Sequence, residues 1–300
     1  MSNFNLTISP AQIEYLLKKD TTITQAYDVI NNSQETIQLI SKVLSFIPQG
    51  GDGDLRYQEY QPNDDISFSL TNSDIKLNQP FSIPPKSKQQ LVLKIKTSPR
   101  AEFQDSYYTF FVQQLGQNQS NFSQATGQIG SHILLTITDQ VDPTNQGHIT
   151  NFQLNPTIKD VFLSQLNFTG EIRNDTNHFI KSTGRVKITK KDKIIREIPL
   201  QSNNILANHY RQIHCQGQQD CSFSPPFWPG KYTATLELEP MLNTPSKSIT
   251  FFIFPISPLA IITLFILLFL LLKKLKNIFS QENSTKTNKK NQTKTEAKNK

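Results

Sequence analysis

Short runs in which apolar residues occupy every second position fill most of this chain. Alternate positions of Leu91–Lys96 and of Ile133–Ile137 are all Leu or Ile, and each run is bounded by Pro, Gly, Asn, Asp or Ser. Successive side chains of a strand point to opposite faces, so this period indicates half-buried antiparallel strands. A helix is conceivable at Ala11–Lys18, but its β-branched and aromatic surroundings favour a strand. The sequence therefore predicts an all-β head.

The length of the head predicts two sandwiches. A chain of 300 residues exceeds one ordinary sandwich of roughly 100–150 residues. We place the first domain at residues 1–139, a turn-rich linker at 140–147 and the second domain at 148–250. Regular strand spacing with turn residues between favours immunoglobulin-like β-sandwiches. The Cys…Trp…Cys spacing of antibody domains is absent, so only the broad architecture is predicted.

An uncharged run from Phe251 to Leu272 follows the head. As a helix rising about 1.5 Å per residue, it is long enough for a hydrocarbon core of about 30 Å. Lys273, Lys274 and Lys276 follow at once, as expected of a stop-transfer signal. The positive-inside rule then predicts a single-pass protein of the cell membrane, in contact with lipid, with an extracellular head and a cytoplasmic C-terminus. The alternative is a buried helix in a soluble protein.

The positive charge is confined to the tail. Nine lysines and two glutamates in residues 273–300 account for the whole net charge of +7. The head is therefore electrically balanced, and nucleic acid is not an expected partner. The tail has almost no apolar residue after Phe279, which predicts a disordered, Lys-rich cytoplasmic segment.

The N-terminus lacks the basic and apolar regions of a signal peptide. We expect either that the start is truncated, which we favour, or that the head lies inside. Cys215 and Cys221 lie six positions apart in a polar loop. In an exported head they predict a disulfide, with two reduced thiols as the alternative. No neighbouring Cys or His has the spacing of a zinc site.

Motifs for catalysis are missing from the sequence. It contains no G-x-S-x-G, no H-E-x-x-H and no phosphate-binding glycine loop. Its five histidines each stand alone in a polar or turn context. Asp52, Asp54 and Glu59 could offer oxygen ligands to calcium, but the EF-hand pattern fails and a solvated loop is the default. We therefore expect no enzyme, no cofactor, no metal and no small-molecule substrate.

Two surface features remain open. Trp228 lies in the aromatic segment Phe223–Tyr232, where it either forms a ligand platform or closes the end of a sandwich. In the head, six asparagines stand in N-x-[ST] triplets, which match the glycosylation sequon but also arise by chance in so Asn-rich a chain. They are Asn5, Asn31, Asn118, Asn121, Asn167 and Asn174.

A family resemblance emerges from the order of these segments. The opening LTISPAQIEYLLKKD, the stretches FSIPPKSKQQLVLKIKTSP and SYYTFFV, and the closing PGKYTATLELE resemble the WxL-interacting proteins of Gram-positive cell surfaces. That resemblance implies two immunoglobulin-like domains, a C-terminal transmembrane helix and partners such as peptidoglycan or other surface proteins. No individual binding residue is carried over.

Two functional hypotheses follow. The first is a non-enzymatic, membrane-anchored surface protein for binding or adhesion, with peptidoglycan or surface proteins as ligands. The alternative is an extracytoplasmic chaperone or assembly factor for secreted surface chains, which would bind an extended peptide at a free sheet edge.

Overall fold

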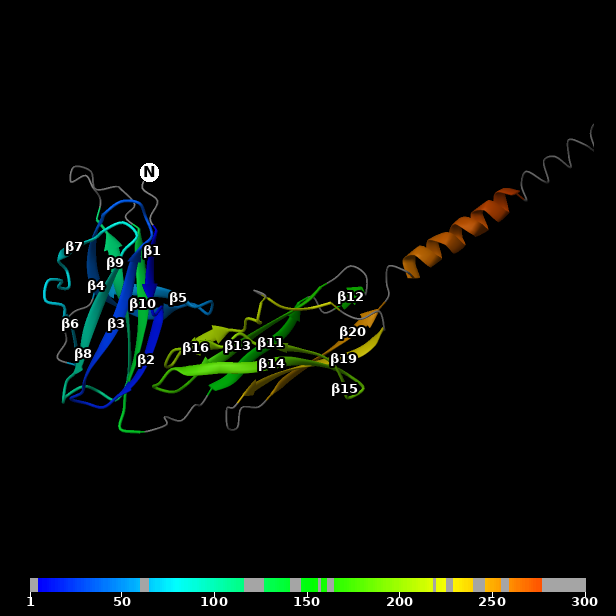
Figure 1. Cartoon of the computed structure of the whole chain (residues 1–300). Coiled ribbons are helices and arrows are strands. Elements are labelled where there is room, and N and C mark those ends of the chain that lie inside the picture. Colours follow the sequence, from blue (N-terminus) through cyan, green and yellow to red (C-terminus); the bar gives the residue numbers. More distant parts are fainter. Residues whose placement is uncertain are drawn as a thin grey trace, which may run out of the picture.

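The computed structural model describes residues 5–59, 65–115, 127–140, 147–155, 158–160, 165–217, 220–224, 229–239, 246–254 and 259–276. These residues form strands apart from turns, loops and one C-terminal helix at residues 259–276. The predicted all-β class is confirmed. Figure 1 shows two groups of strands that run in crosswise directions, with one end of the second group against the side of the first and the helix beyond the other end.

The first group is a sandwich of two sheets. One sheet has the order β1-β3-β8-β6, and the other β2-β10-β9-β4-β5 with β7 also paired to β4. The strands are β1 (Leu6–Ser9), β2 (Gln12–Leu17), β3 (Thr22–Asn31), β4 (Ile37–Gln49), β5 (Asp54–Glu59), β6 (Ile66–Leu70), β7 (Pro80–Ile83), β8 (Lys88–Thr97), β9 (Asp105–Gln114) and β10 (Gln128–Ile137).

The second sandwich follows. Its sheets have the orders β11-β13-β17, with β18 also paired to β13, and β12-β20-β19-β14-β15, with β16 also paired to β14. The strands are β11 (Gly147–Asn155), β12 (Ile158–Asp160), β13 (Leu166–Asn174), β14 (Ile180–Lys190), β15 (Lys193–Pro199), β16 (Asn203–Ile205), β17 (Tyr210–Gln212), β18 (Cys221–Phe223), β19 (Gly230–Glu239) and β20 (Lys247–Phe254).

Each sandwich buries its own core. Alternating residues such as Leu91, Leu93 and Ile95 on β8 are fully buried between the first two sheets. Leu166, Phe168 and Ile172 on β13 do the same in the second sandwich. The period-two pattern of the sequence thus produces these faces, because a strand turns every second side chain inward.

The two sandwiches repeat one topology. β1 pairs antiparallel with β3 as β11 does with β13, and β2 pairs parallel with β10 as β12 does with β20. β4 contacts β9, β5 and β7, while β14 contacts β19, β15 and β16. The chain is therefore an internal structural duplication whose two halves can be compared strand by strand.

A buried asparagine ends the corresponding strand in each half. Asn31 and Asn174 are both 0% exposed. Their Nδ2 atoms donate to the carbonyls of Glu35, Ile83 and Pro84, and of His178, Ile205 and Leu206, at 2.8–3.0 Å. The hydroxyls of Ser33 and Thr176 donate to the two Oδ1 atoms. These two N-x-[ST] triplets are structural turns whose asparagine amides are buried and hydrogen-bonded.

The expected membrane anchor is wrong. Phe251 belongs to β20, and the helix begins only at Leu259 and continues past Leu272 through Lys276. Among the described residues, no helix is both long and apolar enough to cross a membrane, since this helix ends in Lys273, Lys274 and Lys276. The predicted single-pass localisation, with an extracellular head and a cytoplasmic C-terminus, is therefore wrong.

Substituting Asn174 tests the importance of the buried turn. In Asn174→Ala, three carbonyls lose their donor inside the protein, so the free energy of unfolding should fall by about 3 kcal/mol. Urea denaturation measures the change. The control is Asn177→Ala, three residues on, because Asn177 is exposed. Equal losses for the two variants would contradict the assignment.

Candidate functional site

The residues singled out in the sequence do not converge on one site. Cys215 and Cys221 are joined by a disulfide with both residues buried in the second sandwich, where β18 is held next to the preceding loop. Trp228, the expected platform, lies outside the described residues. No group of His, Cys, Asp or Glu in the described segments could hold a metal ion.

The structure instead brings functional groups together where the two sandwiches meet. A small apolar cluster forms the centre of this joint, with Phe46 and Leu134 from the first sandwich and Leu206 from the second. Leu55, Tyr107 and Phe179 pack around it. Phe46, Tyr107 and Leu134 lie on the face of β4, β9 and β10 that points away from the first core. The second sandwich therefore covers part of that outer face.

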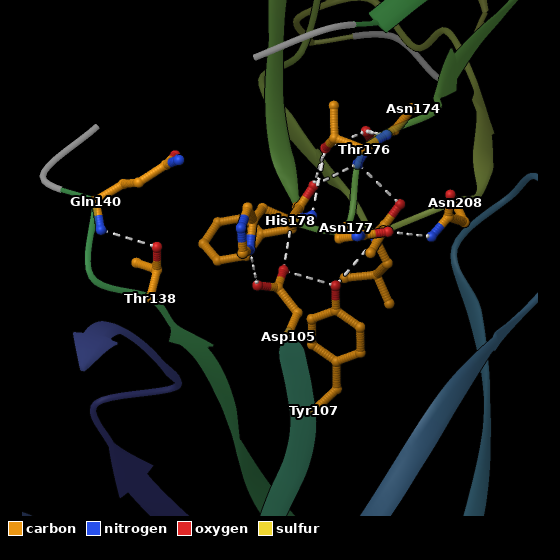
Figure 2. A network of polar contacts seen from close by, with 12 residues as sticks. Asp105, Tyr107, Thr138, Gln140, Asn174, Thr176, Asn177, His178 and Asn208 are labelled. Carbon is orange, nitrogen blue, oxygen red and sulfur yellow. Dashed lines mark hydrogen bonds and ion pairs between the residues drawn. The ribbon is translucent and has the colours of Figure 1, made fainter. Parts of the chain in front are cut away.

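Asp105, the first residue of β9, clamps the two sandwiches together. Its side chain is 0% exposed. Oδ1 lies 3.0 Å from His178 Nδ1, and the Phe179 N–H donates a short hydrogen bond to Oδ2. Figure 2 shows this carboxylate facing the turn between β13 and β14 of the second sandwich. A buried carboxylate requires such donors, because an unpaired buried charge is strongly unfavourable.

Tyr107 makes a second bond across the joint. Its hydroxyl donates to Asp105 Oδ2 at 2.8 Å and accepts the Ala207 N–H at 2.9 Å. Burial and then the neighbouring Asp105 charge raise the pKa of Tyr107, so the phenol stays protonated and keeps donating. The joint is thus a chain of charged and neutral hydrogen bonds that polarise one another.

The turn between β4 and β5 of the first sandwich makes a second set of contacts with the second sandwich. The Gln212 N–H donates to the Gly51 carbonyl at 2.9 Å, and His209 Nε2 donates to the Gly50 carbonyl at 2.9 Å. The Arg211 guanidinium lies against Gly53 (φ 94°) of this turn, so closely that a Cβ atom at position 53 would overlap it. Burial lowers the pKa of Arg211, while Asp52 opposes the effect.

A polar cavity lies beside the joint, next to β2. Glu14 on β2 contacts Lys181 Nζ at 2.7 Å and accepts the Asn204 amide at 2.9 Å. Partial burial pushes the pKa of Glu14 up, but these bonds outweigh it and lower the pKa. The cavity measures about 330 Å³ and is lined by Gln12, Glu14, Lys181, Ser202, Asn203, Asn204 and Arg211. Both sandwiches contribute to its walls.

The outer edge of β2 is open next to this cavity. The Ala11 carbonyl accepts from His132 and the Leu17 carbonyl accepts from Thr138. In a parallel ladder the backbone groups of alternate residues point to opposite sides, so those of Gln12, Glu14 and Leu16 point away from β10. β2 is the last strand of its sheet, and no described residue pairs with these groups. Leu16 is also 47% exposed.

Sequence reasoning missed this joint. The histidines appear isolated in the sequence, yet His178 and His209 contact the first sandwich, and His132 packs against Phe46. Their partners lie 73 and 159 positions away for the first two, so no local pattern signals the contacts. Of the two Asn-x-Ser/Thr turns, only the one at Asn174 leads into the joint, since His178 and Phe179 follow it and contact Asp105.

Comparisons with known proteins give limited information. No family model and no curated protein matches the chain, so the resemblance to WxL-interacting proteins stays a prediction. The fimbrial chaperone CfaA is 14% identical with a TM-score of 0.40, covering 84% of this chain and 100% of its own. The E. coli chaperone DraB is 12% identical with a TM-score of 0.36, covering 82% and 98%. At these values the similarity carries no argument about this chain.

Removing the clamp should loosen the joint. Asp105→Ala leaves the Phe179 N–H and the Tyr107 hydroxyl without their acceptor, which should cost about 3 kcal/mol and separate the unfolding of the two sandwiches. Calorimetry should then show two transitions in place of one. The control is Asp175→Ala, because the contacts of Asp175 with His148 and Arg173 are exposed and lie within the second sandwich. An unchanged single transition in Asp105→Ala would contradict the role of the clamp.

His132 should make stability pH-dependent. Burial lowers its pKa, so as the pH falls the unfolded chain takes up the proton first. The stabilisation by neutral His132 is complete above the unfolded pKa of about 6.5 and is lost as the pH falls from there toward the lower native pKa. Its contacts Thr109 and Phe46 do not titrate in this range. The unfolding free energy should fall less between about pH 8 and about pH 5 in His132→Asn than in the unsubstituted chain. An equal fall in both proteins would refute this role of His132.

Proposed function

We propose that this chain is a non-enzymatic binding protein of the assembly-factor type, which holds an extended segment of another polypeptide at the outer edge of β2. The partner class is a secreted or surface protein. The observation that carries the proposal is the open edge of β2 beside a polar cavity built by both sandwiches. Strand addition at such an edge obtains affinity from backbone hydrogen bonds and selectivity from alternate side chains.

The surroundings of β2 define the segment it would accept. An added strand would place alternate side chains beside Ile13, Tyr15 and Leu17, which face the first core and are buried or half-buried. The intervening side chains would point toward Gln12 and Glu14 at the cavity. The preferred partner segment therefore alternates apolar and polar residues, as a half-buried strand does.

The fixed joint gives this edge its selectivity. The cavity exists only while Lys181, Asn204 and Arg211 of the second sandwich stay beside β2, and Asp105 and the β4–β5 turn hold them there. Preorganised groups bind with less loss of conformational entropy than groups that must be ordered on binding. Peptidoglycan binding stays a prediction that no contact in the described residues supports.

A proline in β2 tests strand addition directly. Leu16→Pro removes an outward N–H without breaking a bond to β10, a position where proline is tolerated in an edge strand. Binding to an array of synthetic peptides with alternating apolar and polar residues should weaken by about tenfold or more, the equivalent of one to two hydrogen bonds. Leu16→Ala is the matched control, since it removes the side chain and keeps the N–H.

The binding results of these two variants decide whether the peptide pairs with β2. Selective loss in Leu16→Pro, together with binding that changes little with salt concentration, supports backbone pairing at β2. Equal binding by Leu16→Pro and the unsubstituted chain, or no binding to any alternating peptide, would rule out β2 as the site.

A further inference from the structure

One loop of the second sandwich contacts the first sandwich at several points. This joint loop comprises residues 201–214. Leu206 belongs to the apolar cluster of the joint, and the Ala207 N–H donates a hydrogen bond across it. His209 and the Gln212 N–H reach the turn between β4 and β5. The placement of the two sandwiches therefore depends on how firmly the joint loop is held.

The joint loop also forms much of the cavity beside β2. It contributes the lining residues Ser202, Asn203, Asn204 and Arg211. Asn204 in addition donates to Glu14 of β2 at 2.9 Å. A displacement of this loop would thus change the cavity and the surroundings of the open edge together.

A short antiparallel ladder closes the joint loop at its base. Leu200 and Cys215 form a bridge, and next to it the Gln201 N–H donates to the His214 carbonyl at 2.8 Å. The disulfide joins Cys215 to Cys221, the first residue of β18. β18 pairs with β13, and both strands contribute to the second core. The disulfide thus ties the base of the loop to a buried strand.

The corresponding strand of the first sandwich has no interruption to bridge. β8, which pairs with β3, is continuous from Lys88 to Thr97. Its counterpart opposite β13 is split into β17 and β18, with three residues each, and the chain between Gln212 and Cys221 separates them. Three residues are at the lower limit of strand length in globular proteins. β17 therefore obtains few ladder hydrogen bonds of its own.

We propose that the disulfide between Cys215 and Cys221 positions the joint loop, and with it the walls of the peptide site beside β2. This inference rests on the function proposed above. The cross-link spans the split between β17 and β18, so β17 keeps its place beside β13 although its ladder is short. Groups that are already ordered lose less conformational entropy on binding. The disulfide should therefore strengthen peptide binding without touching the peptide.

A general stabilisation of the second sandwich is the alternative role of this disulfide. Cross-links commonly raise stability by restricting the unfolded chain, and such an effect would be shared by the whole sandwich. Positioning is a local effect, because loss of the disulfide should release the joint loop before the rest of the sandwich opens. The two roles thus differ in which amides become exposed to solvent.

Amide hydrogen exchange of the full chain measures this difference. The chain is studied in neutral detergent, because its C-terminal helix exposes apolar side chains. The double variant Cys215→Ala/Cys221→Ala contains no thiol. In this variant the joint amides of Ala207 and Gln212 should exchange about tenfold faster relative to the amides of β19, because only the loop is released.

Two further variants separate the disulfide from its surroundings. Leu236→Ala removes a fully buried side chain of β19 from the same core, and should cause no selective acceleration at the joint amides. Gln201→Pro loses one hydrogen bond of the ladder but keeps the disulfide, so the joint loop should stay protected. Release of the loop in Gln201→Pro would contradict the proposal, whether or not the double variant folds.

Binding of the alternating peptides connects the disulfide with the site at β2. The double variant should bind them about tenfold more weakly, whereas Leu236→Ala should bind them as the unsubstituted chain does. Unchanged exchange at Ala207 and Gln212, equal acceleration throughout the sandwich, or unchanged peptide binding would overturn the proposal. If no peptide binds the unsubstituted chain, the proposed function fails, whereas the exchange rates still decide whether the disulfide positions the loop.

Discussion

The carboxylate of Asp105 is the interaction on which the arrangement of the two sandwiches depends. It is fully buried between them, and its donors come from both: Tyr107 from the first, His178 and Phe179 from the second. Taking any donor away leaves a buried charge with fewer partners, which is far more costly than the loss of an exposed ion pair. The clamp thereby fixes the wall of the cavity beside β2.

The duplication places one strand of the fold in two different surroundings. β5 and β15 are the corresponding strands of the two halves, and the turn that precedes β5 packs on the second sandwich through Gly50 and Gly51. The corresponding turn before β15 has no following sandwich among the described residues. The turn thus contacts the other sandwich in the first half, whereas in the second half the strand that follows it is exposed at the end of its sheet.

Local patterns predicted the sheets but not the site. Alternation in Leu91–Lys96 and Ile133–Ile137 determines which faces are buried, since that choice depends only on the neighbouring residues. The joint depends on pairs such as Asp105 and His178, whose separation along the chain leaves no local signal. Asn31 and Asn174 matched a glycosylation sequon, yet their amides bond buried carbonyls. The run from Phe251 to Leu272 is apolar throughout, yet its first residues pair with β19 as part of β20, a contact that the local sequence does not signal.

Residue-resolved amide hydrogen exchange on the isolated chain tests the open edge of β2 most directly. The amides of Ile13, Tyr15 and Leu17 face β10 and should exchange slowly, while those of Gln12, Glu14 and Leu16 should exchange fast, because protection requires a hydrogen-bond partner. That alternation within one strand is the predicted result. Uniformly slow exchange along β2 would mean that its outer edge is already paired, and would contradict the proposed mode of binding.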